Sequence, residues 1–73
     1  MVEDNIRSFV MAQPHVLEMH GFYMNERDQR MRFDVVVDFD ADWPTLYKKI
    51  QAYIKNAYPD YVIQITRDID TSD

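Results

Sequence analysis

An almost strict alternation of apolar and polar side chains runs from Arg30 to Asp40, and it restricts the possible folds more than any other feature of the sequence. A period of two residues is typical of a β-strand that buries one face and leaves the other open. The apolar set consists of Met31, Phe33, Val35, Val37 and Phe39, and the opposite set consists of Arg32, Asp34, Val36, Asp38 and Asp40. The sequence therefore predicts a sheet with one apolar face and one polar face.

Two further strands are predicted, one before and one after this segment. Residues 16–24 are rich in apolar and aromatic side chains, and the polar turn 25–29 joins them to the alternating strand as a hairpin. Residues 61–70 alternate again, with Tyr61, Ile63, Ile65 and Ile69 on one face and Val62, Gln64, Thr66, Asp68 and Asp70 on the other. The polar positions of these strands are expected to share the open face of the sheet.

Two amphipathic helices are predicted, one before the hairpin and one before the last strand. The first spans about residues 4–12, with Asp4 or Asn5 as its cap. The second spans about residues 42–58 and carries Pro44 in its first turn, where proline is tolerated. Each helix is expected to end shortly before a proline, because the residue that precedes a proline avoids the helical conformation. Their apolar stripes are Ile6, Phe9 and Val10 in the first and Leu46, Ile50, Tyr53 and Ile54 in the second.

The predicted order of elements is helix, strand, strand, helix, strand, which defines an α+β domain. The second helix joins the second and third strands, so these two strands should be parallel and connected by a right-handed crossover. Both helices then cover the apolar face of a three-stranded mixed sheet. A chain of 73 residues has room for a single domain of this kind, spanning residues 1–73.

The small size of the chain implies that something besides its core stabilises it. A domain of this length buries only ~60% of the surface that its unfolded chain exposes. The absence of cysteine excludes disulfides and thiolate metal sites. Two means of stabilisation remain, which are a metal held by oxygen and nitrogen ligands, and oligomerisation.

Charge and motifs exclude several classes of function. The net charge of −5 repels phosphate backbones, so no nucleic acid partner is expected, whereas divalent cations suit an acidic chain. The sequence has no glycine-rich phosphate loop and no serine or cysteine nucleophile with a recognisable base, so we expect no enzyme. It also has no apolar run long enough to span a bilayer and no signal peptide.

The polar face of the predicted sheet carries a candidate metal site. A hairpin centred on Arg27 places His20 opposite Asp34, roughly 5 Å apart at Cβ. Carboxylates and neutral imidazoles are the ligands expected for a divalent cation where sulfur is absent. The candidate ligands are His20, Asp34 and Asp68, with Asp38 and Asp70 nearby. The same pattern fits an ordinary solvated sheet face, and the residues alone leave both interpretations open.

Residues 14–20 (Pro-His-Val-Leu-Glu-Met-His) are similar to the motif Pro-Gly-Val-x-x-x-His, with His20 at the motif histidine. This motif opens the cytoplasmic C-terminal domain of cation diffusion facilitators, which are membrane transporters of divalent metals, and the chain resembles that domain. The order of helices and strands and the aromatic–proline pair Tyr58-Pro59 also match. The segments 20–23, 33–40, 58–61 and 68–70 look like a bacterial branch of the family, so the resemblance covers nearly the whole chain.

The resemblance implies a ferredoxin-like, metallochaperone-like fold that lacks its first strand. It implies a homodimer beneath the transmembrane domain of the same protein, a part absent from this chain, and hence a cytoplasmic domain of a cell-membrane protein. It also implies that a divalent metal binds the domain, tightens the pairing and promotes efflux. Zinc is the expected ion, with manganese, iron and cobalt as the other candidates.

The chain departs from the zinc-transporting pattern at two positions. Where that pattern has histidines in its second and last strands, this chain has Val37 and Thr66, although Asp68 matches the last-strand acid. Either the acids Asp34, Asp38 and Asp70 replace those histidines in an oxygen-rich site, or the domain mainly dimerises. The alternative function is a free-standing dimeric ligand-binding domain of similar fold without a membrane part, and a small hydrolase that uses paired carboxylates ranks third.

Overall fold

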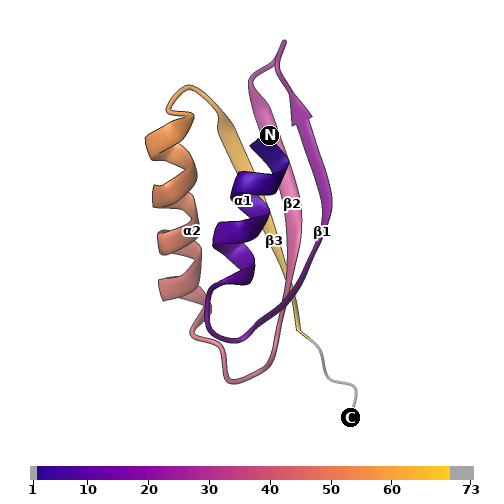
Figure 1. Cartoon of the computed structure of the whole chain (residues 1–73), viewed down its shortest axis with the longest axis vertical. Coiled ribbons are helices and arrows are strands. Elements are labelled where there is room, and N and C mark those ends of the chain that lie inside the picture. Colours follow the sequence, from indigo (N-terminus) through magenta and orange to yellow (C-terminus); the bar gives the residue numbers. More distant parts are fainter. Residues whose placement is uncertain (1, 70–73) are drawn as a thin grey trace.

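The computed structural model describes residues 2–69, which form two helices and three strands (Figure 1). The order helix, strand, strand, helix, strand confirms the predicted α+β fold. None of the described helices is long and apolar enough to cross a membrane. In chain order the elements are α1 (Val2–Met11), β1 (Val16–Asn25), β2 (Arg30–Val37), α2 (Trp43–Ala57) and β3 (Val62–Ile69).

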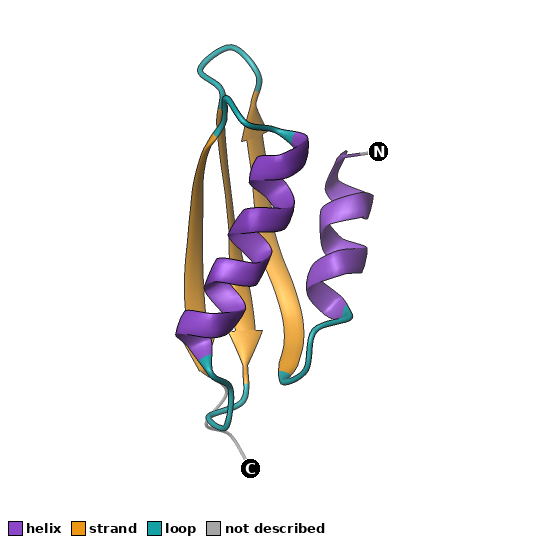
Figure 2. Ribbon diagram, turned by 90° about the vertical axis from the view of Figure 1, so that its left-hand side faces the viewer, coloured by secondary structure: helices purple, strands orange, loops and turns teal. Residues whose placement is uncertain are grey.

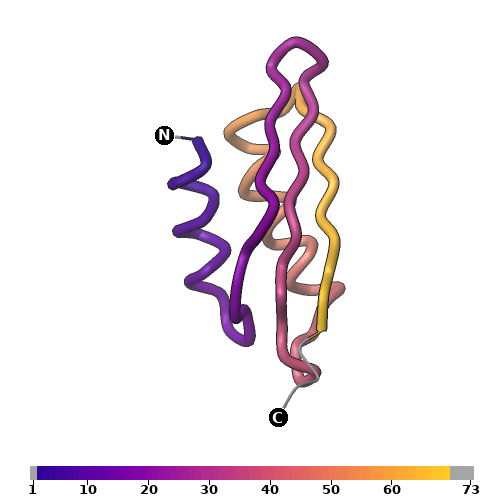
Figure 3. The backbone as a smooth tube through the Cα atoms, turned by 90° about the vertical axis from the view of Figure 1, so that its right-hand side faces the viewer, coloured from indigo at the N-terminus to yellow at the C-terminus, as the bar shows by residue number. Residues whose placement is uncertain are grey.

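The three strands form one mixed sheet with β2 in the centre. β1 pairs with β2 in the antiparallel direction and β3 pairs with β2 in the parallel direction, as the hairpin and the crossover helix predict. Both helices lie on the same face of the sheet (Figure 2), and no described element lies in front of the other face (Figure 3). We call this uncovered side the open face.

Apolar side chains from every helix and strand fill the layer between the helices and the sheet. The centre of this core is the apolar face of β2, where Met31, Phe33, Val35 and Val37 are each at most 1% exposed. Phe9 and Tyr53 stack on each other, with ring centroids 3.9 Å apart, and so join the two helices. The buried residues that cover the sheet are Ile6 and Val10 from α1 and Leu46, Ile50 and Ile54 from α2.

Helix α2 begins where the sequence predicts, because Asp42 caps it. The Asp42 carboxylate accepts hydrogen bonds from the backbone N–H and the hydroxyl of Thr45, at 3.4 and 2.9 Å. Pro44 lies in the first turn, where a missing N–H costs little. The helix ends at Ala57, ahead of Pro59.

Helix α1 starts earlier than predicted. It begins at Val2, so Asp4 and Asn5 lie inside its first turns and do not cap it. Acidic side chains in a first turn interact favourably with the positive end of the helix dipole, and Glu3 and Asp4 provide them. The Glu3 carboxylate also accepts a hydrogen bond from the guanidinium of Arg7, one turn further along the helix, with Nη2 and Oε2 2.8 Å apart. These interactions favour helix before the predicted cap.

Strand β2 ends at Val37, before the predicted end at Asp40. Oδ1 of Asp38 accepts a hydrogen bond from the N–H of Asp40 at 3.0 Å, and the carbonyl of Asp38 accepts one from Ala41 at 3.2 Å. An aspartate that binds the backbone two residues further on turns the chain. Phe39 therefore leaves the alternation and is 78% exposed, so its predicted place on the apolar face is wrong.

A β-bulge at Gly21 interrupts the pairing of the hairpin. His20 pairs with Asp34 but Tyr23 pairs with Arg32, so β1 contains one residue more than β2 over this stretch. Gly21 has a φ of +64°, in the left-handed region that glycine adopts at little cost. Because of the extra residue, both His20 and Tyr23 lie on the open face, where they pair with Asp34 and Arg32.

Candidate functional site

The open face presents rows of side chains that cross the three strands. Each row takes one residue from β1, one from β2 and one from β3, according to the register of the sheet. Acids and a histidine lie at one end of the face, and two arginines lie at the hairpin end. The rows are Glu18, Val36 and Asp68; His20, Asp34 and Thr66; Tyr23, Arg32 and Gln64; and Asn25, Arg30 and Val62.

His20 and Asp34 lie opposite each other near the middle of this face, which confirms the predicted pair. Nε2 of His20 lies 3.3 Å from Oε1 of Glu18, an acid that the sequence analysis did not single out. The half-buried Asp34 lies beside Gly21, where an added Cβ would come within 3.3 Å of its Oδ2. The missing side chain at Gly21 therefore leaves room for the Asp34 carboxylate.

The other predicted ligands lie further apart. Asp68 on β3 is opposite Val36, in the row next to that of His20. Asp38 lies beyond the end of β2 and pairs with His15, and Asp70 lies outside the described residues. Within the part of the chain that the structure describes, no three His, Asp or Glu side chains form a group able to hold a metal ion. One copy therefore offers suitable ligand types without a complete set.

His15 joins the loop after α1 to the end of β2. Its Nδ1 lies 3.0 Å from both carboxylate oxygens of Asp38, and the N–H of Asp38 donates to the carbonyl of His15 at 3.1 Å. The hydrogen bond to Asp38 and the charge of that carboxylate, with a smaller effect from Asp40, raise the pKa of His15 above its ordinary value of 6.5. Asp38 is thus engaged in a contact between two loops and not with His20.

Asp38→Asn is expected to lower the pKa of His15 toward 6.5, because the substitution removes the charge that favours the protonated ring. Since folding raises this pKa, the contact stabilises the domain fully below the unfolded-state pKa of ~6.5, and its effect is lost as the pH rises through the folded-state pKa. An NMR titration of the His15 ring measures the change, with Asp40→Asn as a control that should lower the pKa less. Equal pKa values in the wild type and Asp38→Asn would contradict the contact.

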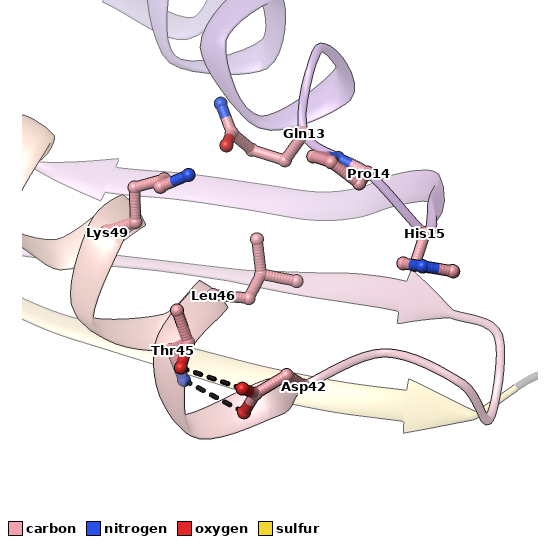
Figure 4. A pocket seen from close by; sticks show the side chains of 7 residues that line it. All are labelled: Gln13, Pro14, His15, Asp42, Thr45, Leu46 and Lys49. Atoms are coloured by element: carbon pink, nitrogen blue, oxygen red, sulfur yellow. Dashed lines mark hydrogen bonds between the residues drawn. The ribbon is translucent and has the colours of Figure 1, made fainter.

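A small cavity of about 140 Å³ lies beside His15, between the loop after α1 and the first turns of α2 (Figure 4). The Asp42 carboxylate at its rim is already engaged in capping α2 through Thr45. The cavity is therefore explained as a gap between a loop and a helix cap, and we assign it no ligand. Its lining residues are Gln13, Pro14, His15, Asp42, Thr45, Leu46 and Lys49.

A larger depression of about 490 Å³ lies at the hairpin end of the open face. The guanidinium of Arg32 lies over the ring of Tyr23, 5.5 Å from its centroid, in a cation–π contact. The positions of Arg30 and Arg32 on either side of Met31 indicate that they share one face, although no role was predicted for them. The lining residues are Tyr23, Arg30, Met31, Arg32, Val62 and Gln64.

Comparison with protein-family models, with curated proteins and with solved structures finds no match for this chain. The resemblance to cation diffusion facilitators therefore stays a hypothesis that rests on the sequence motifs. The geometry of the open face is what can support or weaken it.

Proposed function

We propose that this chain is the regulatory, dimerising cytoplasmic domain of a divalent-cation efflux transporter of the cation diffusion facilitator family. Two copies pair through their open faces, and a divalent cation tightens the pairing. Zinc is the first candidate, followed by manganese, iron and cobalt. The transmembrane part of the same protein is the second partner, and the domain itself catalyses no reaction.

The placement of His20 opposite Asp34 on an uncovered sheet face carries the proposal. Imidazole and carboxylate are the ligands that zinc and related ions take where thiolates are absent. His20 is also the residue that matches the motif histidine of the family. Thr66, opposite Asp34 on β3, adds a hydroxyl oxygen to the same row.

The incomplete ligand set of one copy supports a link between metal binding and pairing. Structural zinc sites almost always have four ligands, and the described residues contain no group of three acids or histidines that could hold an ion. A cation bound beside His20 and Asp34 therefore needs further ligands from water or from a second copy. If a second copy supplies them, the ion binds the paired state alone and stabilises it by mass action.

The backbone at His15 gives separate support to the resemblance. His15 stands where the family motif has glycine, and its φ of +69° lies in the left-handed region. Glycine adopts this region readily, whereas residues with a Cβ seldom do. A motif with glycine at this position is therefore suited to the turn that the chain makes here.

The family's zinc-transporting pattern has a histidine where this chain has Val37, but this difference is weak evidence against a metal site on the open face. Val37 is 1% exposed and lies in the core, so no side chain at this position could bind an ion on the open face. The residues of β2 that do lie on the open face near His20 are Asp34 and Val36. An oxygen-rich site built around Asp34 therefore suits the chain better than a site with several histidines.

Sedimentation velocity tests the proposal. The wild type is expected to be a dimer at high micromolar concentration, because none of the described helices and strands covers the open face of its sheet. Zinc should lower the dissociation constant of the dimer and a chelator should reverse the change. His20→Ala should remove the effect of zinc, whereas His15→Ala should keep it. A stable monomer with and without metal would refute the proposal.

A further inference from the structure

The open face has opposite charges at its two ends. Arg30 and Arg32 lie at the hairpin end, whereas Glu18, Asp34 and Asp68 lie toward the other end. The sign changes between neighbouring rows, at the step from Arg32 to Asp34 along β2. A chain with an overall charge of −5 thus keeps a basic patch on the one face that no helix covers.

The two arginines are available to an acidic partner. Within residues 2–69, neither Arg30 nor Arg32 forms an ion pair with an acid of its own chain. Arg32 rests on the ring of Tyr23, which orients the guanidinium without neutralising its charge. Both arginines border the depression of about 490 Å³, so an incoming carboxylate has room to reach them.

We infer that, in the metal-free dimer, this basic end binds the acidic end of the same face on a second copy, with the strands of the two sheets antiparallel. The inference rests on the proposed pairing and adds its orientation. A two-fold axis that lies in the interface, perpendicular to the strands, brings the arginines of each copy over the acids of the other. An axis parallel to the strands places like charges on one another, which is repulsive.

The dimensions of the face are compatible with this arrangement. Packed sheets lie ~10 Å apart, a gap that an extended arginine largely spans. Three strands of about eight residues present roughly 400 Å² in projection on each copy, hence roughly 800 Å² in total, somewhat less than the ~1,000 Å² in total of a specific interface. Because this area is modest, the affinity should depend on the charge pairs and fall with ionic strength. In the metal-free dimer the arginines supply the positive charge that a cation otherwise supplies.

A charge exchange, followed by sedimentation in chelated, metal-free buffer, tests the inference. R30E/R32E makes both ends acidic and should raise the dissociation constant of the dimer at least about tenfold. Adding E18K and D68K to the same chain makes the outer part of the acidic end basic while Asp34 stays acidic, so the constant should recover at least about threefold from that of R30E/R32E without reaching the wild-type value. K48E/K49E on α2 gives the same change in net charge as R30E/R32E and should leave the constant nearly unchanged.

The outcomes separate the orientation from the pairing itself. Circular dichroism and thermal melting establish that each variant folds, which is expected because all six positions are exposed. The orientation is overturned if R30E/R32E behaves like K48E/K49E, or if the variant that adds E18K and D68K does not recover. Either result with a dimeric wild type leaves the proposed function intact, whereas a monomeric wild type removes both.

Discussion

Phe33→Ala is expected to lower the free energy of unfolding by ~3–5 kcal/mol, the usual cost of removing a buried phenylalanine. Phe33 is 1% exposed in the central strand, and its ring centroid lies 6.2 Å from that of Phe22. Core residues of both helices and all three strands surround this layer, so the cavity cannot collapse without shifting an element. A domain of this length has a total stability of only ~4–11 kcal/mol, so the variant should be close to unfolded.

Phe39→Ala is the matched control, because it removes the same side chain from a position that is 78% exposed. Its effect should stay within ~0.5 kcal/mol. Urea denaturation at one protein concentration measures both variants and keeps any contribution from dimerisation equal. Equal losses of stability would contradict the placement of Phe33 in the core and of Phe39 in a solvent-exposed turn.

The alternation along β2 predicted the buried face correctly, because burial of one face fixes the parity of a strand. The predicted hairpin centre at Arg27 correctly placed His20 opposite Asp34, although for a hairpin without a bulge. Pairs nearer the turn, such as Tyr23 with Arg32, are shifted by one residue, and Gly21 absorbs the shift. The pairing of His20 with Asp34 was therefore predicted correctly, although the bulge in β1 was not predicted.

The end of β2 could not be predicted from the same alternation. Phe39 continues the apolar pattern in the sequence, but the bond from the Asp40 N–H to the Asp38 side chain ends the strand first. Side-chain bonds of this kind compete with the ladder of a sheet and leave no mark on hydrophobic periodicity. Asp38, predicted to lie near the metal ligands His20, Asp34 and Asp68, is engaged elsewhere for the same reason, since its carboxylate turns away to His15.

The arginine cluster and the position of Glu18 required the assembled sheet. Their grouping depends on the register of the three strands, which places Glu18 in one row with Val36 and Asp68 and places Arg32 in one row with Tyr23 and Gln64. A sequence gives the parity of each strand but only an approximate register between strands. Functional contacts across strands are therefore the part that the sequence predicts least well.

A divalent cation should stabilise the wild-type domain by ~2.7 kcal/mol when present at a hundred times its dissociation constant. The ion binds the folded state alone, because His20 and Asp34 come from two different strands that meet only in the sheet. For a domain of this size the stabilisation corresponds to a rise in Tm of roughly 10–20 °C. The effect should weaken in acid, because an imidazole must be neutral to bind a metal.

Thermal unfolding with zinc and with a chelator is the most direct test of a metal-responsive open face, and manganese, iron(II) and cobalt can be compared in the same way. Zinc should raise the Tm of the wild type and much less that of His20→Ala and Asp68→Asn. His15→Ala and Asp60→Asn remove the same side-chain types away from this face and should keep the full rise. If the wild type shows no rise, or if His20→Ala and Asp68→Asn keep it in full, the open face is solvated surface and the proposed metal site is wrong.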